Sequence, residues 1–185
     1  MEQDREYCHN LLKEYTKGDG LLKHAYSVEA CVAAYAKEFG EDEKYWGNVA
    51  LLHDFDYEKY PSMEEHPSEG SKILEEKGFG EEFRRAIMSH ANHTNVTRET
   101  KLEKTLFACD ELAGFITAVT LVRPSKSLDE VKVKSVKKKM KDKRFAAAVS
   151  REDIINGAED LGIPLEEHIQ FCIDAMREQK ELLGL

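Results

Sequence analysis

The chain has 185 residues, of which 41% are hydrophobic and 34% are charged. This balance is typical of one globular domain and excludes an intrinsically disordered protein. No apolar run approaches the roughly 20 residues that a helix needs to cross a bilayer, so we expect no membrane partner.

The N-terminus and the cysteines bear on where the protein works. The first ten residues, MEQDREYCHN, are polar and acidic, unlike a secretory signal or a transit peptide. The four cysteines are scattered and form no CxxC pair, which indicates reduced thiols and not disulfides or a cysteine zinc site. Together these features predict a cytoplasmic location.

The net charge of −9 is unevenly distributed along the chain. The segment from Arg123 to Arg151 holds eleven Lys or Arg residues against three acids, whereas the remainder is strongly acidic. A basic segment on an acidic protein either faces an anionic ligand or forms a solvated surface that balances the acidic body. Because the acidic body repels a polyanion, we expect no long nucleic acid as a partner.

Apolar residues recur at helical spacing through the first two thirds of the chain. Gly40 is placed to end a long helix, and Pro61 and Pro67 predict a loop over the stretch DYEKYPSMEEHP. Pro124 is placed to end the last helix of this part. The predicted helices cover about residues 19–40, 42–54, 67–77, 81–91 and 99–121.

Three further helices are predicted after Pro124. Ser127 with Glu130 fits a capping box for the first of them, and Ser150 with Asp153 fits an N-cap for the second, which runs to Gly162. The last helix begins near Pro164 and ends around Leu183. No strand-like alternation of convincing length occurs, so we predict an all-α fold. It forms one domain over 1–185, with its core at about 20–120 and basic and C-terminal helices at about 122–185.

Histidines and carboxylates gather in the predicted core. Five of the seven histidines lie between residues 24 and 93, and the stretch LLHDFDY places His53 and Asp54 at the end of an apolar helix. His24 begins an apolar helix face, and Asp110 lies on the apolar stripe of the long helix. A buried carboxylate is costly unless it is paired or coordinated, and imidazole and carboxylate ligands suit transition metals. Taken singly, a histidine on an apolar helix face is usually a hydrogen-bonded core residue, and Asp110 could pair with a buried lysine or arginine.

The order His24, His53-Asp54 and Asp110 on successive helices resembles the HD-domain superfamily of metal-dependent phosphohydrolases. The flanking stretches LLHD, HPSEG at 66–70 and AIMSH at 86–90 are similar to an uncharacterised HDIG-related branch. The resemblance covers about residues 20–120 and implies an HD-domain helical bundle, which agrees with the all-α prediction.

The resemblance implies a site for one divalent transition metal, namely Mn, Fe, Zn, Co or Ni. Its implied ligands are His24, His53, Asp54 and Asp110. Members with two metals use extra histidines, and His66 and His90 stand at the expected positions. A proton relay is open to Asp54, His66 or His90, which are therefore the candidate catalytic residues.

Two positions depart from the family pattern or fit it incompletely. Phe55-Asp56 replaces the Ile-Gly of a strict HDIG tetrad, and no GYP motif follows, which disfavours the cyclic-di-GMP phosphodiesterase branch. Asp56 either orients a ligand or caps the next turn. His93 is either a group behind the ligands or a surface residue, and we favour the surface.

The basic segment follows the helix that carries Asp110, so it is a candidate for binding substrate phosphates. The residues expected to bind them are Arg123, Lys126, Lys134, Lys137 and Lys138. The expected function is hydrolysis of a phosphate ester of a nucleotide or small phosphorylated metabolite by metal-activated water. The alternatives are a non-catalytic nucleotide- or partner-binding module and a phosphodiesterase on short oligonucleotides. The sequence leaves the oligomeric state open.

Overall fold

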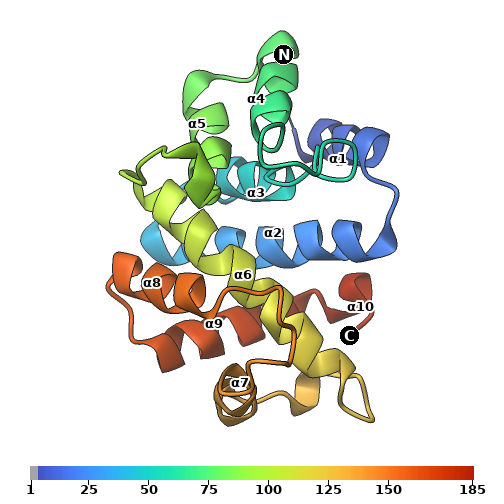
Figure 1. Cartoon of the computed structure of the whole chain (residues 1–185), viewed down its shortest axis with the longest axis vertical. Helices are drawn as coiled ribbons and strands as arrows, with labels where there is room; N and C mark the ends of the chain where they lie inside the picture. The colour runs from blue at the N-terminus through green and yellow to red at the C-terminus, as the bar shows by residue number, and fades with distance from the viewer. Residues whose placement is uncertain (1–3) are drawn as a thin grey trace.

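The computed structural model describes residues 4–185, and within them the fold is all-α, as predicted (Figure 1). Residues 1–3, which begin the polar N-terminus and the predicted domain, lie outside the described part. The first six helices are α1 (Arg5–Tyr15), α2 (Asp19–Phe39), α3 (Glu43–Leu51), α4 (Ser68–Glu76), α5 (Glu81–His90) and α6 (Lys101–Leu121). The others are α7 (Val133–Met140), α8 (Arg151–Leu161), α9 (Leu165–Glu178) and α10 (Lys180–Leu183), with short 3-10 turns η1 (Asn92–Thr94) and η2 (Leu128–Glu130).

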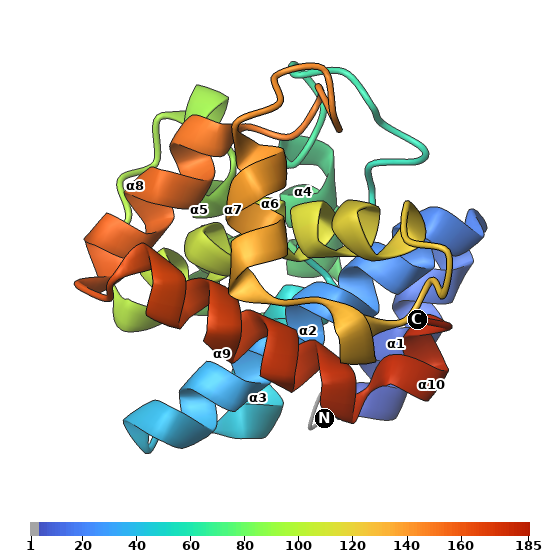
Figure 2. The same cartoon turned by 90° about the horizontal axis from the view of Figure 1, so that it is seen from below.

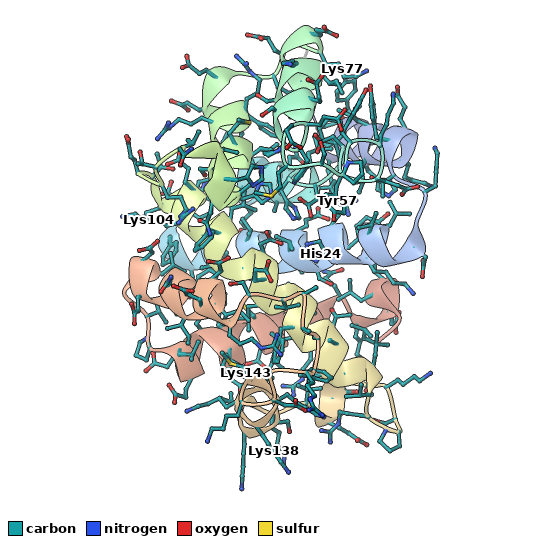
Figure 3. The ribbon with its side chains drawn as sticks, viewed as in Figure 1. His24, Tyr57, Lys77, Lys104, Lys138 and Lys143 are labelled. Carbon is teal, nitrogen blue, oxygen red and sulfur yellow. The ribbon has the colours of Figure 1, made fainter. Side chains whose placement is uncertain are left out.

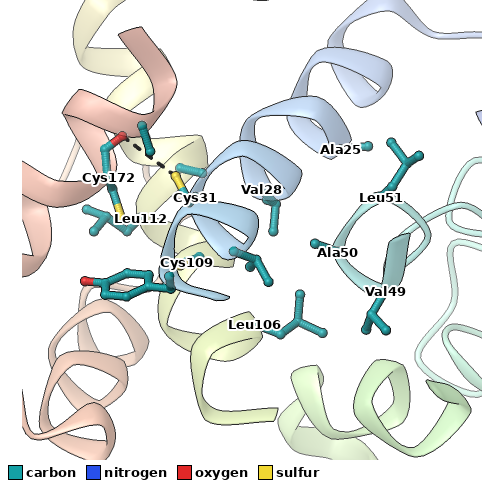
Figure 4. Packing of buried hydrophobic residues seen from close by; sticks show 14 of the residues in the cluster. Ala25, Val28, Cys31, Val49, Ala50, Leu51, Leu106, Cys109, Leu112 and Cys172 are labelled. Carbon is teal, nitrogen blue, oxygen red and sulfur yellow. Dashed lines mark hydrogen bonds between the residues drawn. The ribbon is translucent and has the colours of Figure 1, made fainter. Parts of the chain in front are cut away.

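Helices α2 and α6 form the centre of the molecule. Helix α2 packs against α3, α6 and α9, and α6 also packs against α5 and α8. The facing sides of the two helices are apolar and fully buried, for example at Val28 and Leu112 (Figure 4). Each such side chain removed from water stabilises the fold by roughly 1.5–3 kcal/mol. Among the described helices, none is long and apolar enough to cross a membrane.

All four cysteines are buried in or beside this core. The thiol of Cys31 on α2 donates to the carbonyl of Cys172 on α9 at 3.8 Å (Figure 4). Burial raises the pKa of the Cys8 thiol to about 12. Among the described residues no disulfide joins them.

The helix predicted over 42–54 ends earlier, at Leu51. The Nδ1 of His53 donates to the carbonyl of Ala50 at 2.7 Å, so the ring occupies the acceptor that a continued helix would offer to the Asp54 amide. His53 and Asp54 therefore lie in the turn after α3. This turn frees both side chains from the constraint that neighbours on a helix point about 100° apart.

The C-terminal region departs from prediction in two places. Ser127 does not form a capping box with Glu130, because its hydroxyl accepts from the nearby amide of Asp129 at 3.2 Å within η2. Helix α7 begins later, without a side-chain cap. The predicted last helix is also divided at Gln179 into α9 and α10, and α10 turns back to pack on α2. The N-cap predicted for Ser150 is confirmed, since its hydroxyl accepts from the Asp153 amide at 3.1 Å.

One helix, α1, was not expected from the sequence. Asp4 caps it by accepting from the amide of Tyr7 at 2.9 Å. Only Cys8, Leu11 and Leu12 of α1 are buried, which gives too short an apolar pattern to stand out from the polar residues around it.

Candidate metal centre

Four side chains from three elements converge between α2 and α6. His24 comes from α2, His53 and Asp54 from the turn after α3, and Asp110 from α6, and one ligand atom of each lies within 4.8 Å of the others. The Nε2 of His24 donates to Oδ1 of Asp110 at 2.9 Å. The Nε2 of His53 lies 3.3 Å from Oδ2 of Asp54 and 3.4 Å from Oδ1 of Asp110. The structure thus brings together the four residues implied as ligands of one metal.

The ring of His53 is held in a single orientation. It is fully buried, and its Nδ1 is committed to the Ala50 carbonyl, so Nε2 faces the two carboxylates. This buried Nε2 has no hydrogen-bond partner in the described structure. An unsatisfied buried polar atom costs about 1–3 kcal/mol, so a nitrogen in this setting fits a metal ligand whose partner is the ion.

A second group of ligands shares Asp54 with the first. The Oδ1 of Asp54 lies 3.2 Å from Nε2 of both His66 and His90. Its other oxygen, Oδ2, faces His24 and His53. The Nδ1 of His90 donates to the Ile87 carbonyl at 2.5 Å, which leaves Nε2 toward the cluster. Asp54 therefore has one oxygen in each of two adjoining ligand sets.

Asp56 both orients a candidate ligand and caps a helix turn, the two roles that the sequence left open. It is fully buried, and its Oδ1 accepts from Nδ1 of His66 at 2.8 Å, which orients that ring. Its Oδ2 accepts from the amide of Gly70 at 2.8 Å and so caps the first turn of α4. A Cβ at Gly70 would lie 2.7 Å from the Asp56 carboxylate, so this close approach requires glycine.

The electrostatics of the cluster favour a cation. Burial alone lowers the pKa of His53, but Asp54 and Asp110 outweigh it and hold that pKa well above its ordinary value. Burial also lowers the pKa of His66, yet Asp54 and Asp56 raise it to about 9. Burial raises the pKa of Asp54 and Asp110, and the imidazoles reverse this and hold both below their usual range. The nitrogens and carboxylate oxygens that shift one another's pKa values are the same atoms that a metal would bind.

A cavity of about 750 Å³ opens over both ligand sets. The side chains of Asp54 and Asp110 are 22% and 17% exposed, so they remain reachable from it, whereas His53 is sealed beneath them. Tyr57 and Met63 line one side. A second cavity of about 660 Å³, between α2 and α9, shares no residue with the ligand sets.

Three residues beside the ligands were not assigned to the site from the sequence. His93 is partly buried and donates from Nε2 to the His66 carbonyl at 2.8 Å, so the surface interpretation was wrong. Glu111 lines the cavity, and burial together with Asp110 raises its pKa to about 7. Asp153, expected only as a helix-cap partner, also lines the cavity. The only sequence signal for Glu111 was its position next to Asp110.

The structure does not bring the predicted phosphate-binding residues to this cavity. None of Arg123, Lys126, Lys134, Lys137 and Lys138 lines it. Lys137 forms an ion pair with Glu166, and Arg123 lies 3.6 Å from Glu130. Figure 3 shows Lys138 projecting at the end of the molecule far from His24. The reason is geometric, because α6 continues for about 17 Å beyond Asp110 before it ends at Leu121.

Comparison with protein families finds one match, to the family described as HD domain, over residues 21–114. No curated protein and no solved structure matches the chain significantly. The matched segment contains every residue of both ligand sets. It ends before α8 and the loop that precedes it, which supply another wall of the cavity.

Proposed function

The chain belongs to the HD-domain family, and we propose that it is a metal-dependent phosphohydrolase acting on a phosphate ester of a nucleotide or another small phosphorylated metabolite. The observation that carries the proposal is the fully buried Nε2 of His53, which has no hydrogen-bond partner and faces Asp54 and Asp110. Nitrogen and oxygen donors of this kind suit a divalent transition ion such as Mn, Fe, Zn, Co or Ni.

The proposed first ion is held by His24, His53, Asp54 and Asp110. A second ion would be held by His66 and His90 together with Asp54, whose two oxygens face the two sets. What a bound divalent ion supplies is positive charge at the phosphoryl oxygens and a lower pKa for a water molecule. The narrower assignment to an HDIG-related branch stays a prediction.

The chain's own contribution is to fix the orientation of the histidine rings in both ligand sets. The rings of His53 and His90 are fixed by backbone carbonyls, and the ring of His66 is fixed by Asp56. Such preorganised groups need no rearrangement during the reaction. Without a second ion, Nε2 of His66 is the group placed to give a proton to a departing oxygen, with its ring held by Asp56. With a second ion, that nitrogen is a ligand.

The proposal is tested by elemental analysis of purified protein alongside His53→Ala and Asp54→Ala. We expect one or two equivalents of a transition metal in the wild type and a loss in both variants. His9→Ala is the matched control, because His9 is partly buried and bonds the Tyr26 hydroxyl at 2.8 Å outside both ligand sets.

Activity on mononucleotides, sugar phosphates and short oligonucleotides then separates the proposed phosphohydrolase from a phosphodiesterase. Folded wild-type protein that takes up no metal after reconstitution contradicts the proposal. That result would favour a non-catalytic module that binds a nucleotide or a partner.

A further inference from the structure

The cavity over the ligand sets also has an acidic wall, whose residues belong to neither ligand set. Glu111 on α6 and Asp153 on α8 line it, together with Val149 of the loop between α7 and α8. Figure 2 shows this loop and the loop between α3 and α4 on the same side of the molecule. The wall and the ligand sets therefore face one space.

The carboxylates of this wall are held in place. The Oε2 of Glu111 accepts from the Ser150 amide at 2.9 Å, and Oδ1 of Asp153 accepts from the side-chain amide of Asn92 at 3.1 Å. Asn92 is itself fixed, since its Oδ1 accepts from Arg98 at 3.1 Å. In the described structure no hydrogen bond reaches the second oxygen of Glu111 or of Asp153 from another side chain or the backbone. One acceptor on each carboxylate therefore remains for a ligand.

The loop that carries Val149 is also held by hydrogen bonds and by a cation–π contact. The guanidinium of Arg151 donates to the carbonyls of Ala146 and Val149 at 2.6 Å and 2.7 Å, and it lies 4.6 Å from the centre of the Phe115 ring. Glu111 ties the end of the same loop to α6 through Ser150. A wall fixed at several points can distinguish ligands by shape and charge.

No Lys or Arg lines this cavity among residues 4–185, although four carboxylates do. The cations beside the wall are engaged elsewhere. Arg98 stacks on Phe107 at 3.6 Å from the ring centre and donates to the Ser89 carbonyl, and Arg151 donates to backbone carbonyls of its own loop. A single phosphate can be neutralised at the proposed metal site. A second phosphate would meet Glu111 and Asp153 with no cation to offset its charge.

We propose that Glu111 and Asp153 form a specificity subsite for the hydroxyl groups of a phosphate monoester, with Asn92 as the positioning residue for Asp153. The substrate class is a sugar phosphate or a nucleoside monophosphate, and the same wall disfavours nucleoside di- and triphosphates. This inference rests on the proposed phosphohydrolase function and adds its choice of substrate. A hydrogen bond to the unused oxygen of each carboxyl group is the interaction that would select the hydroxyls.

The first test compares two substrates that differ in hydroxyl groups. The ratio of kcat/KM for ribose 5-phosphate to that for 4-nitrophenyl phosphate is measured in the wild type, Glu111→Gln and Asp153→Asn. These variants keep the size of each side chain and an oxygen for its present hydrogen bond. We expect the ratio to fall about tenfold in each variant. Glu152→Gln, an exposed neighbour outside the cavity lining, should leave the ratio unchanged.

The second test is binding without turnover. Calorimetric Kd values for AMP and ADP are measured at pH 8 in chelator-treated protein, in the wild type and in the Glu111→Gln/Asp153→Asn double variant. We expect ADP to bind more weakly than AMP in the wild type and the difference to shrink severalfold in the double variant, because two negative charges are removed.

The outcomes separate this inference from the function on which it rests. Wild-type protein that hydrolyses 4-nitrophenyl phosphate, with the same substrate ratio in every variant, overturns the specificity subsite and leaves the phosphohydrolase intact. Parallel loss of both activities in folded, metal-loaded variants also overturns it. Wild-type protein that binds metal but hydrolyses none of these phosphates overturns both proposals.

Discussion

Two regions of the molecule carry many ionisable groups. Those between α2 and α6 are largely buried, whereas those around α7 are largely exposed. In the first, His53, His66 and His90 are at most 7% exposed, and their nitrogens converge on carboxylates. In the second, Lys134 and Lys138 are exposed. Charge is tolerated inside the first region because opposite charges and backbone carbonyls compensate it there, whereas the lysines are simply hydrated.

The sharpest way to break this comparison is to remove the carboxylate that both ligand sets share. Asp54→Asn should abolish uptake of both ions and lower phosphatase activity by at least about 100-fold, because each set loses an ionised donor. Asp129→Asn is the matched change in the basic region, where Asp129 forms an exposed pair with Lys180. Elemental analysis and kcat/KM should show no change for that control. Normal metal content in Asp54→Asn would contradict the shared-ligand arrangement.

The next effect is a pH dependence that only the inward-facing region should show. The folded pKa of His66 is about 9, above its unfolded value of about 6.5. The stability from its protonated ring is therefore fully present below pH 6.5 and is lost as the pH rises through 9. Chelator-treated protein should lose up to about 3 kcal/mol of unfolding free energy over that window, measured by urea titration. In His66→Gln the loss should be smaller, with His53 as a remaining group whose pKa is raised, and an equal loss in that variant would assign it to other groups.

A smaller effect is expected from crowding the residue that orients His66. Gly70→Ala places a Cβ 2.7 Å from the Asp56 carboxylate, so it should cost about 1–3 kcal/mol in stability and weaken binding at the His66 set. Gly20→Ala, whose Cβ meets nothing within 4 Å, should be neutral or stabilise α2 by about 0.5–1 kcal/mol. Thermal unfolding and metal titration measure both. Equal stability and equal metal affinity in the two variants would show that the Asp56 carboxylate moves aside at little cost.

The smallest effect is expected in the outward-facing region. The Lys134→Ala/Lys138→Ala double variant should change the unfolding free energy by less than about 1 kcal/mol and leave metal content and KM unaltered, since neither side chain lines the cavity. A KM several times higher in this variant would instead show that the basic helix reaches the substrate, as the sequence suggested.

Much of the helical framework could be read from the sequence because it depends on local pattern. The spacing of apolar residues on α2 and α6 is a property of each segment alone, and so is the Ser150 cap. The early end of α3 was missed because it depends on a side-chain bond from His53 to the backbone. Helix α10 turns away from α9 because it packs on α2, a contact that no local pattern records.

The candidate ligands were likewise accessible from sequence, since the order His24, His53-Asp54 and Asp110 resembles a family whose match covers residues 21–114. What only the tertiary structure decided is what surrounds them. Glu111 and Asp153 meet at one cavity although 42 positions separate them in the sequence, while the lysines of α7 are carried away from it by the length of α6. Sequence reports which side chains are available along a helix. Which of them face one another across a cavity depends on how the helices pack, since that packing sets distance and direction.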